Sequence, residues 1–169
     1  MKKIVKISLL AVALIASLSA HAEGKIAVLN AQQAIINTEV AQARLKTLRE
    51  EASYAANRKQ LEELGKSYQD TVAQLQKDAA VMSAEQKQAE AKKIQEKRVD
   101  IEFIQKKLQT AEQGLLQSVA QELAPKLQKA VGELIESEGI GLLLNQQAAM
   151  HADSSFSITA KVTDKLNQM

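Results

Sequence analysis

The sequence predicts an α+β protein in which a long antiparallel α-helical coiled-coil hairpin forms an arm on a small β-containing body. The 169-residue chain has no tryptophan, two tyrosines and two phenylalanines. It is rich in alanine, glutamine, leucine, glutamate and lysine, a composition typical of long helices and coiled coils. Apolar residues at heptad spacing fill the middle of the chain, and short apolar segments typical of strands lie near its two ends.

The first 22 residues have the three parts of a secretory signal peptide. Lys2, Lys3 and Lys6 precede a twelve-residue apolar stretch, residues 7–18, and the small residues of Ala20-His21-Ala22 follow it. We expect cleavage after Ala22. A retained membrane anchor is the alternative, but it needs roughly 17–25 apolar residues. The stretch is too short for that, so the sequence predicts export.

Removal of residues 1–22 changes the charge of the chain. The whole sequence has 22 Lys+Arg and 20 Asp+Glu, a net charge of +2, and the loss of three lysines leaves 19 against 20, or −1. Nucleic-acid binding is not indicated, because it needs a concentrated excess of basic residues. The absence of cysteine excludes zinc–thiolate sites and thiol redox chemistry.

Short strands are expected at both ends of the mature chain. Residues 25–30, KIAVLN, predict a buried strand, after which Asn30 and Thr38 can each cap a helix. Residues 140–145, IGLLLN, predict a second buried strand, and 148–152, AAMHA, a third. The candidate strand residues of the body are Ile26, Val28, Ile140, Leu142 and Leu144.

The chain is expected to end in an amphipathic helix, with Val162 and Leu166 on its inner face. We expect Ser157 or Thr159 to cap this helix.

Two long helical segments lie between these ends. In the first, apolar residues follow heptad spacing at Ala41, Leu45, Leu48, Ala52 and Ala55, and after an interruption at Leu61, Leu64, Tyr68, Val72, Leu75 and Ala79. In the second, the spacing is regular from Ile94 to Ser118. Pro125 predicts a kink and Gly139 the end of the second helix.

The chain is expected to reverse between these helices. Ser83 with Gln86 matches a capping box, so a new helix should start after Ser83. A single rod of about a hundred residues would hold the two terminal strands about 150 Å apart and leave both unpaired. A hairpin roughly 65 Å long brings them together. The candidate tip is Ala79, Ala80, Val81, Met82 and Ser83. Ser83 inside one continuous helix remains the alternative.

This reading divides the chain into a signal peptide, 1–22, a body from 23–37 and 124–169, and an arm, 38–123. The body has too few residues for a good core of its own. We therefore expect several chains to share one core through their strands.

No catalytic arrangement is recognisable. His151 is the one histidine after the signal peptide, and Asp153 and Ser154 lie near it without a nucleophile-elbow pattern. The acid pairs Glu50-Glu51 and Glu62-Glu63 are best explained as solvated helix faces. We expect no enzyme activity, metal or cofactor.

Nearly the whole mature chain resembles the Skp/OmpH periplasmic chaperones. The resemblance is carried by KIAVLNAQQAI (25–35), LQKDAAVMSAEQKQAEAKKIQEK (75–97), LLQSVAQELAPKLQKAVGELIESEGIGLLLN (115–145) and SFSITAKVTDKLNQM (155–169), in that order. It implies a jellyfish-shaped homotrimer in the periplasm, with a trimerisation body and helical arms around a cavity for unfolded outer membrane proteins. It implies no ATP.

The leading hypothesis is an ATP-independent holdase that prevents the aggregation of such clients. One alternative is a structural or adaptor coiled-coil protein that docks another envelope protein. Another is a weak contact with anionic lipid or lipopolysaccharide through the basic residues of the returning helix. These are Lys87, Lys92, Lys93, Lys97, Arg98, Lys106 and Lys107.

Overall fold

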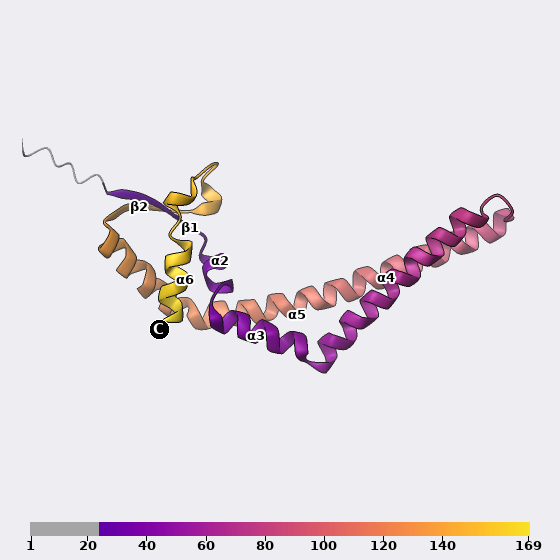
Figure 1. The fold of residues 1–169 in the computed structure, drawn as a ribbon, viewed down its shortest axis with the longest axis horizontal. Coiled ribbons are helices and arrows are strands. Elements are labelled where there is room, and N and C mark those ends of the chain that lie inside the picture. The colour runs from indigo at the N-terminus through magenta and orange to yellow at the C-terminus, as the bar shows by residue number, and fades with distance from the viewer. Residues whose placement is uncertain (1–23) are drawn as a thin grey trace, which may run out of the picture.

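The computed structural model describes residues 24–169, so the predicted signal peptide and its cleavage after Ala22 lie outside the described residues. The described chain is elongated, with a small body at one end and a two-helix arm projecting from it (Figure 1). This confirms the predicted fold class of helical hairpin and small β-containing body. Within residues 24–169, no helix is both long enough and apolar enough to cross a membrane.

The two predicted strands pair with each other. Strand β1 (Lys25–Leu29) and strand β2 (Ile140–Asn145) run parallel, with Ile26 opposite Leu142 and Val28 opposite Leu144. A parallel pair needs a crossover connection, and here the whole arm supplies it. The strands cross closely at their start, because a Cβ atom on Gly24 would lie 2.5 Å from the Cα atom of Gly141. Glycine is therefore required there.

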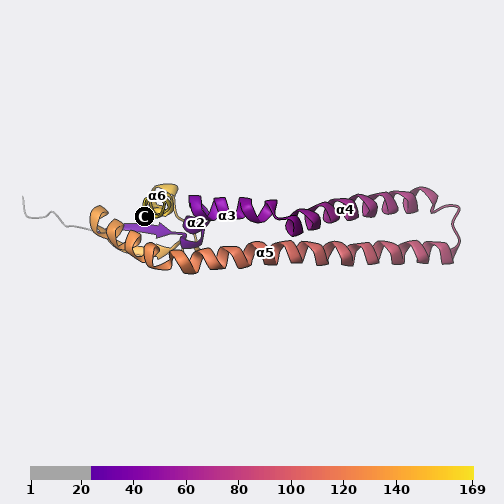
Figure 2. The ribbon, with the colours of Figure 1, turned by 90° about the horizontal axis from the view of Figure 1, so that it is seen from below.

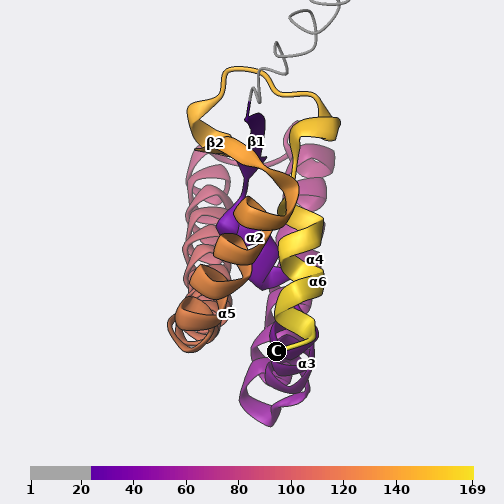
Figure 3. The ribbon, with the colours of Figure 1, turned by 90° about the vertical axis from the view of Figure 1, so that its left-hand side faces the viewer.

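The body core lies on one side of this pair. Figure 3 shows helices α2 (Ala31–Ile36), α5 (Ala84–Glu138) and α6 (Thr159–Asn167) extending from the same side of the strands. Ala27 and Leu29 of β1 pack there among side chains from these helices. The buried residues of these helices in the core are Ala34, Ile35, Val119, Leu123, Ala130, Leu134, Val162 and Leu166.

The arm is an antiparallel pair of helical segments (Figure 2). Helices α3 (Glu39–Glu50) and α4 (Ala52–Asp78) lead outward, residues 79–83 reverse the chain, and α5 returns to the body. The predicted capping box is confirmed, because Ser83 accepts from the Gln86 amide and the Gln86 side chain accepts from the Ser83 amide. The predicted side-chain caps at Asn30 and Thr38 are also present.

Helix α5 stays helical through Pro125 and ends at Gly139, which adopts a left-handed backbone with φ of 63°. Figure 1 shows its axis turning where it enters the body.

The outgoing helix has a break that the sequence did not predict. Glu51 separates α3 from α4 with an extended backbone, φ −59° and ψ 135°. Continued heptad spacing would place Ala52, Ala55 and then Lys59 against α5, but both alanines are exposed. The break shifts the helix phase so that Tyr54 and Leu61 face α5 instead. Burial of Tyr54 thus offsets the loss of helical hydrogen bonds, each worth about 1 kcal/mol.

The segment after β2 also differs from the prediction. No third strand forms at 148–152: residues Gln146–Ala148 and Ser154–Phe156 form short 3-10 helices, η1 and η2, with irregular chain between. The one bridge to the sheet from this segment joins Ser157 to Val28. Neither Ser157 nor Thr159 is the N-cap of α6, which begins after Ile158 without a side-chain cap. The Thr159 hydroxyl accepts instead from the Asn30 amide, 3.0 Å away.

Candidate functional site

One face of the strand pair is apolar and open to solvent. Side chains alternate along a strand, so Ile26 and Leu142 point away from the body core that holds Ala27 and Leu29. Ile26 is 51% exposed, Leu142 is 47% exposed and Leu144 is 36% exposed. The prediction that both strands are buried is therefore wrong for β2 within one chain. We call the residues Ile26, Val28, Leu142, Leu144 and Phe156 the sheet face.

The sheet face includes a hollow of about 390 Å³. Val28 and Leu144 form part of its wall, and Phe156 and His151 from the segment after β2 form another part. Val28 is buried, but Phe156 is 45% exposed. Ile140, the remaining candidate strand residue of the body, packs in the body core and not on the sheet face. Phe156 was missed because it lies outside the predicted strands.

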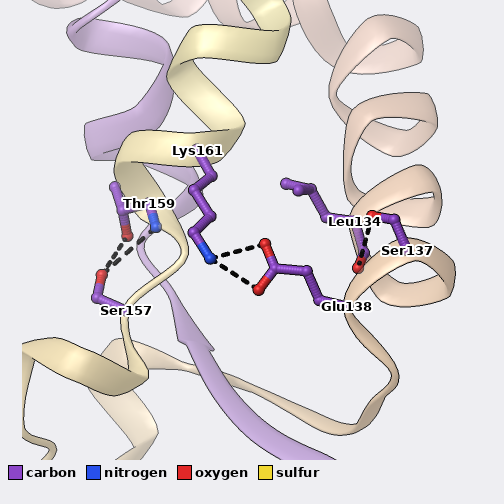
Figure 4. A network of polar contacts seen from close by, with 6 residues as sticks. All are labelled: Leu134, Ser137, Glu138, Ser157, Thr159 and Lys161. Atoms are coloured by element: carbon purple, nitrogen blue, oxygen red, sulfur yellow. Dashed lines mark hydrogen bonds and ion pairs between the residues drawn. The ribbon is translucent and has the colours of Figure 1, made fainter.

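Polar contacts hold α6 and the strands in place behind this face. Lys161 of α6 donates to both carboxylate oxygens of Glu138 at the end of α5, each 2.7 Å away (Figure 4). The Ile158 amide donates to the Val28 carbonyl at 3.0 Å. Lys165 pairs with Glu133 at 2.6 Å and lowers the pKa of that carboxyl. These contacts fix α6 to α5 and to β1 behind the sheet face.

The arm is packed near the body and open further out. Tyr54, Ile104 and Leu108 form a buried cluster, with Leu48 and Leu64 against it. Between residues 55 and 103 no side chain is buried. The apolar seam of the outer arm is only partly covered, because Leu61, Leu64 and Ile94 are intermediate in exposure and not buried.

A polar network crosses the arm beside the break. Arg49, in the last turn of α3, donates from Nε to Glu112 Oε1 of α5 at 3.1 Å. The Tyr54 hydroxyl of α4 donates to the same oxygen at 2.8 Å. The pKa of Arg49 is raised, first by its hydrogen bond to Glu112. The pKa of Tyr54 is raised, first by burial and then by Glu112.

Further apolar side chains are exposed on the surface of the arm. Val99 and Phe103, one turn apart on α5, are 53% and 66% exposed, and Val81 at the tip is 85% exposed. Residues four apart share one helix face.

Part of the basic charge on α5 is paired with acidic side chains of the same helix. Lys93 pairs with Glu90 at 2.6 Å and Arg98 with Glu102 at 2.9 Å. These pairs weaken the positive field expected from the sequence.

The residues considered for chemistry are not brought together. His151 is exposed in the segment after β2, and Asp153 accepts from the Ser155 amide at 2.8 Å as the cap of η2. Glu50, Glu51 and the Glu62-Glu63 pair lie exposed on the arm. Among residues 24–169 no group of three or more His, Asp and Glu side chains is placed to hold a metal ion.

Three comparisons with known proteins gave matches. The sequence profile of the OmpH family, outer membrane protein (OmpH-like), matches residues 25–166. A Skp-like protein of Pseudomonas aeruginosa is 28% identical over 170 residues, which cover 100% of this chain and 99% of that protein. A crystal structure of an OmpH-like protein from Caulobacter crescentus aligns with 85% of this chain and 83% of its own at 16% identity and a TM-score of 0.42. Because the family profile spans nearly all of the described residues, the chain belongs to the OmpH-like family.

Proposed function

We propose that this protein is an ATP-independent holdase of the periplasm, which binds unfolded outer membrane proteins between its arms and prevents their aggregation. Membership of the OmpH-like family supports a chaperone role. The observation that carries the proposal is the open arm: no side chain from 55 to 103 is buried, although Leu61, Leu64, Ile94 and Ile101 lie along it.

An open seam suits a client without fixed structure. Each partly exposed leucine or isoleucine offers a small apolar area, worth roughly 25 cal/mol per Å² when it is covered. Such contacts are weak one by one, and a flexible chain can form them in many arrangements. Several arms around one client would add these contacts through high effective concentration. Enclosure therefore provides strong binding without a fixed pocket or nucleotide.

The arms would be brought together by the sheet face. Exposed apolar surface of this kind marks an interaction site in soluble proteins. Ile26, Leu142 and Phe156 of one chain would be covered by the same surface of its neighbours. The number of chains, three, comes from the resemblance to the Skp/OmpH chaperones.

The experiment is an aggregation assay with the mature protein, residues 23–169. An unfolded outer membrane β-barrel protein is diluted from urea without nucleotide, and its light scattering is followed. We expect scattering to be suppressed at one assembly per client, and ATP to have no effect. Unchanged scattering at a several-fold excess of chaperone would contradict the proposal.

A docking role is the second candidate, and the exposed pair Val99 and Phe103 favours it. The pair would contact an apolar helix of another envelope protein. Two results together would favour docking over the holdase. One is a stable complex with one envelope protein that is lost with Phe103→Ser, and the other is full aggregation of the client in the presence of the protein.

A further inference from the structure

The outgoing side of the arm is divided, whereas the returning side is continuous. Glu51 ends α3 and begins α4 without proline or glycine, while α5 runs unbroken from Ala84 to Glu138 opposite it. Figure 1 shows α3 and α4 meeting at an angle. Glu51 is exposed and makes no side-chain cap for α4. Local sequence chemistry alone therefore does not fix this angle.

The angle between α3 and α4 is therefore fixed by contacts with α5. A single oxygen, Oε1 of Glu112, accepts from Arg49 on one side of the break and from Tyr54 on the other. Arg49 Nη2 also lies 3.1 Å from the same oxygen. Glu112 thus joins the end of α3 to the start of α4.

The packing beside Glu112 leaves room for movement. A hollow of about 160 Å³ lies next to the break, with Leu48, Glu51, Tyr54 and Leu108 among its lining residues. Leu48 and Ala111 are only partly buried. Close packing resists displacement, and it is incomplete at this position. The polar contacts of Glu112 therefore add to the apolar packing of Tyr54 in holding the angle.

We propose that Glu112 is a latch that sets the angle between α3 and α4, so that its contacts with Arg49 and Tyr54 determine the direction of the outer arm. When the latch opens, α4, the tip and the outer part of α5 bend together at the level of Glu51, while α3 stays docked on the body. Helix α3 is held there by Ala41, which is buried in the body core, and by the Glu39 amide, which donates to Asn167 Oδ1 at 2.9 Å.

The consequence for clients rests on the proposed function. If arms enclose an unfolded protein, the angle at Glu51 sets the width of the space between them. A latch made of one carboxylate and two donors lets this width change without unfolding the body.

The test measures the angle directly, in the full mature assembly without client. The chain has no cysteine, so spin labels at Ala43→Cys on α3 and Gln69→Cys on α4 report one distance across the break. Labelled chains are diluted into unlabelled chains so that only distances within a chain are seen. We expect a narrow distance distribution for the otherwise unchanged protein, and a broader one for Glu112→Gln and Tyr54→Phe.

Matched variants distinguish a latch from a general effect on α5. Glu102→Gln removes a carboxylate of the same helix that pairs only with Arg98 on that helix; we expect no broadening. Arg49→Gln should broaden the distribution as Glu112→Gln does. Raising the salt concentration should broaden the unsubstituted protein but leave Glu112→Gln unchanged, because screening acts on the ion pair. Circular dichroism confirms that each variant is folded.

Superimposable distributions for Glu112→Gln, Arg49→Gln and the parent protein would overturn the latch. This readout uses no client, so it stands or falls independently of the holdase assay. A broadened distribution with no protection of any client would retain the latch and contradict the holdase.

Discussion

Ile26 and Leu142 are paired across the two parallel strands, and both side chains point away from the body core. A folded single chain leaves about half of each exposed, 51% and 47%. The neighbouring pair, Val28 and Leu144, extends the same surface. We propose that neighbouring chains cover this face and so enlarge the core of a small body.

The first prediction concerns this face. Leu142→Asp should weaken assembly by at least about 100-fold in dissociation constant, because an unpaired charge buried at an interface costs several kcal/mol. Sedimentation equilibrium measures the mass. Val99→Asp introduces the same charge at a similarly exposed position on the arm and should leave the mass unchanged. An assembly that persists with Leu142→Asp at micromolar concentration would show that the sheet face is not the interface.

The second prediction concerns the buried cluster of the arm. Ile104 is 4% exposed beside Tyr54 and Leu108. Ile104→Ala should lower the free energy of local arm opening by about 2–4 kcal/mol, through lost apolar burial and a cavity. Hydrogen exchange of amides in α4 and α5 measures this. Val99→Ala, at an exposed site, should change it by less than about 0.5 kcal/mol. Equal effects of Ile104→Ala and Val99→Ala would show that the buried cluster does not stabilise the arm.

The third prediction concerns a lysine in the apolar seam. Lys97 stands between Ile94 and Ile101 in the heptad pattern, at a position where an apolar residue is expected. Its ammonium donates to the Ser67 hydroxyl. A cation at such a position lowers coiled-coil stability. Lys97→Leu should raise the free energy of arm opening by about 1 kcal/mol, from added apolar burial.

Hydrogen exchange tests this change as well. Lys93→Leu is the control, since the Lys93 side chain is 58% exposed. A stabilisation by Lys93→Leu equal to that by Lys97→Leu would mean that the position in the seam has no importance.

The fourth prediction concerns pH. The hydrogen bond and charge of Lys165 lower the pKa of Glu133 below its ordinary value of 4.5. A lowered acid pKa stabilises the folded state above the ordinary value, and this contribution is lost as pH falls through the lowered one. Docking of α6 should therefore weaken as pH falls below about 4.5.

Glu133→Gln should reduce this pH dependence, as followed by the hydrogen exchange of α6 amides. Glu136→Gln, at an exposed glutamate one turn away, should retain it. If the hydrogen-exchange protection of α6 amides in the unsubstituted protein does not change from pH 6 to pH 3, the role given to the Glu133–Lys165 pair is wrong.

The sequence predicted features that depend on near neighbours. The Ser83 capping box, the caps at Asn30 and Thr38 and the positions of both strands follow from local residue chemistry, and the structure has them. The hairpin followed from the need to pair two short strands. The caps and the strand positions needed no knowledge of the rest of the molecule, whereas the hairpin needed both strands to be considered together.

Features that depend on distant contacts were predicted less well. The break at Glu51 arises because Tyr54 is buried against Ile104 and Leu108, which lie far along the chain. The sequence signal for this break was the spacing between Leu48 and Tyr54, which does not fit the heptad pattern of apolar residues. A third strand at 148–152 was wrong because apolar character alone does not supply a strand to pair with. Leu142 is exposed because no element of the same chain covers that side of the strand pair, and no pattern within the strand reveals this.

Native mass spectrometry of the mature chain with one unfolded outer membrane β-barrel protein, without nucleotide, tests the central claim most directly. We predict a complex with the mass of three chains plus one client, and the loss of both the trimer and the bound client with Leu142→Asp. A single chain without client, under conditions where its arm and body are folded, would contradict the account.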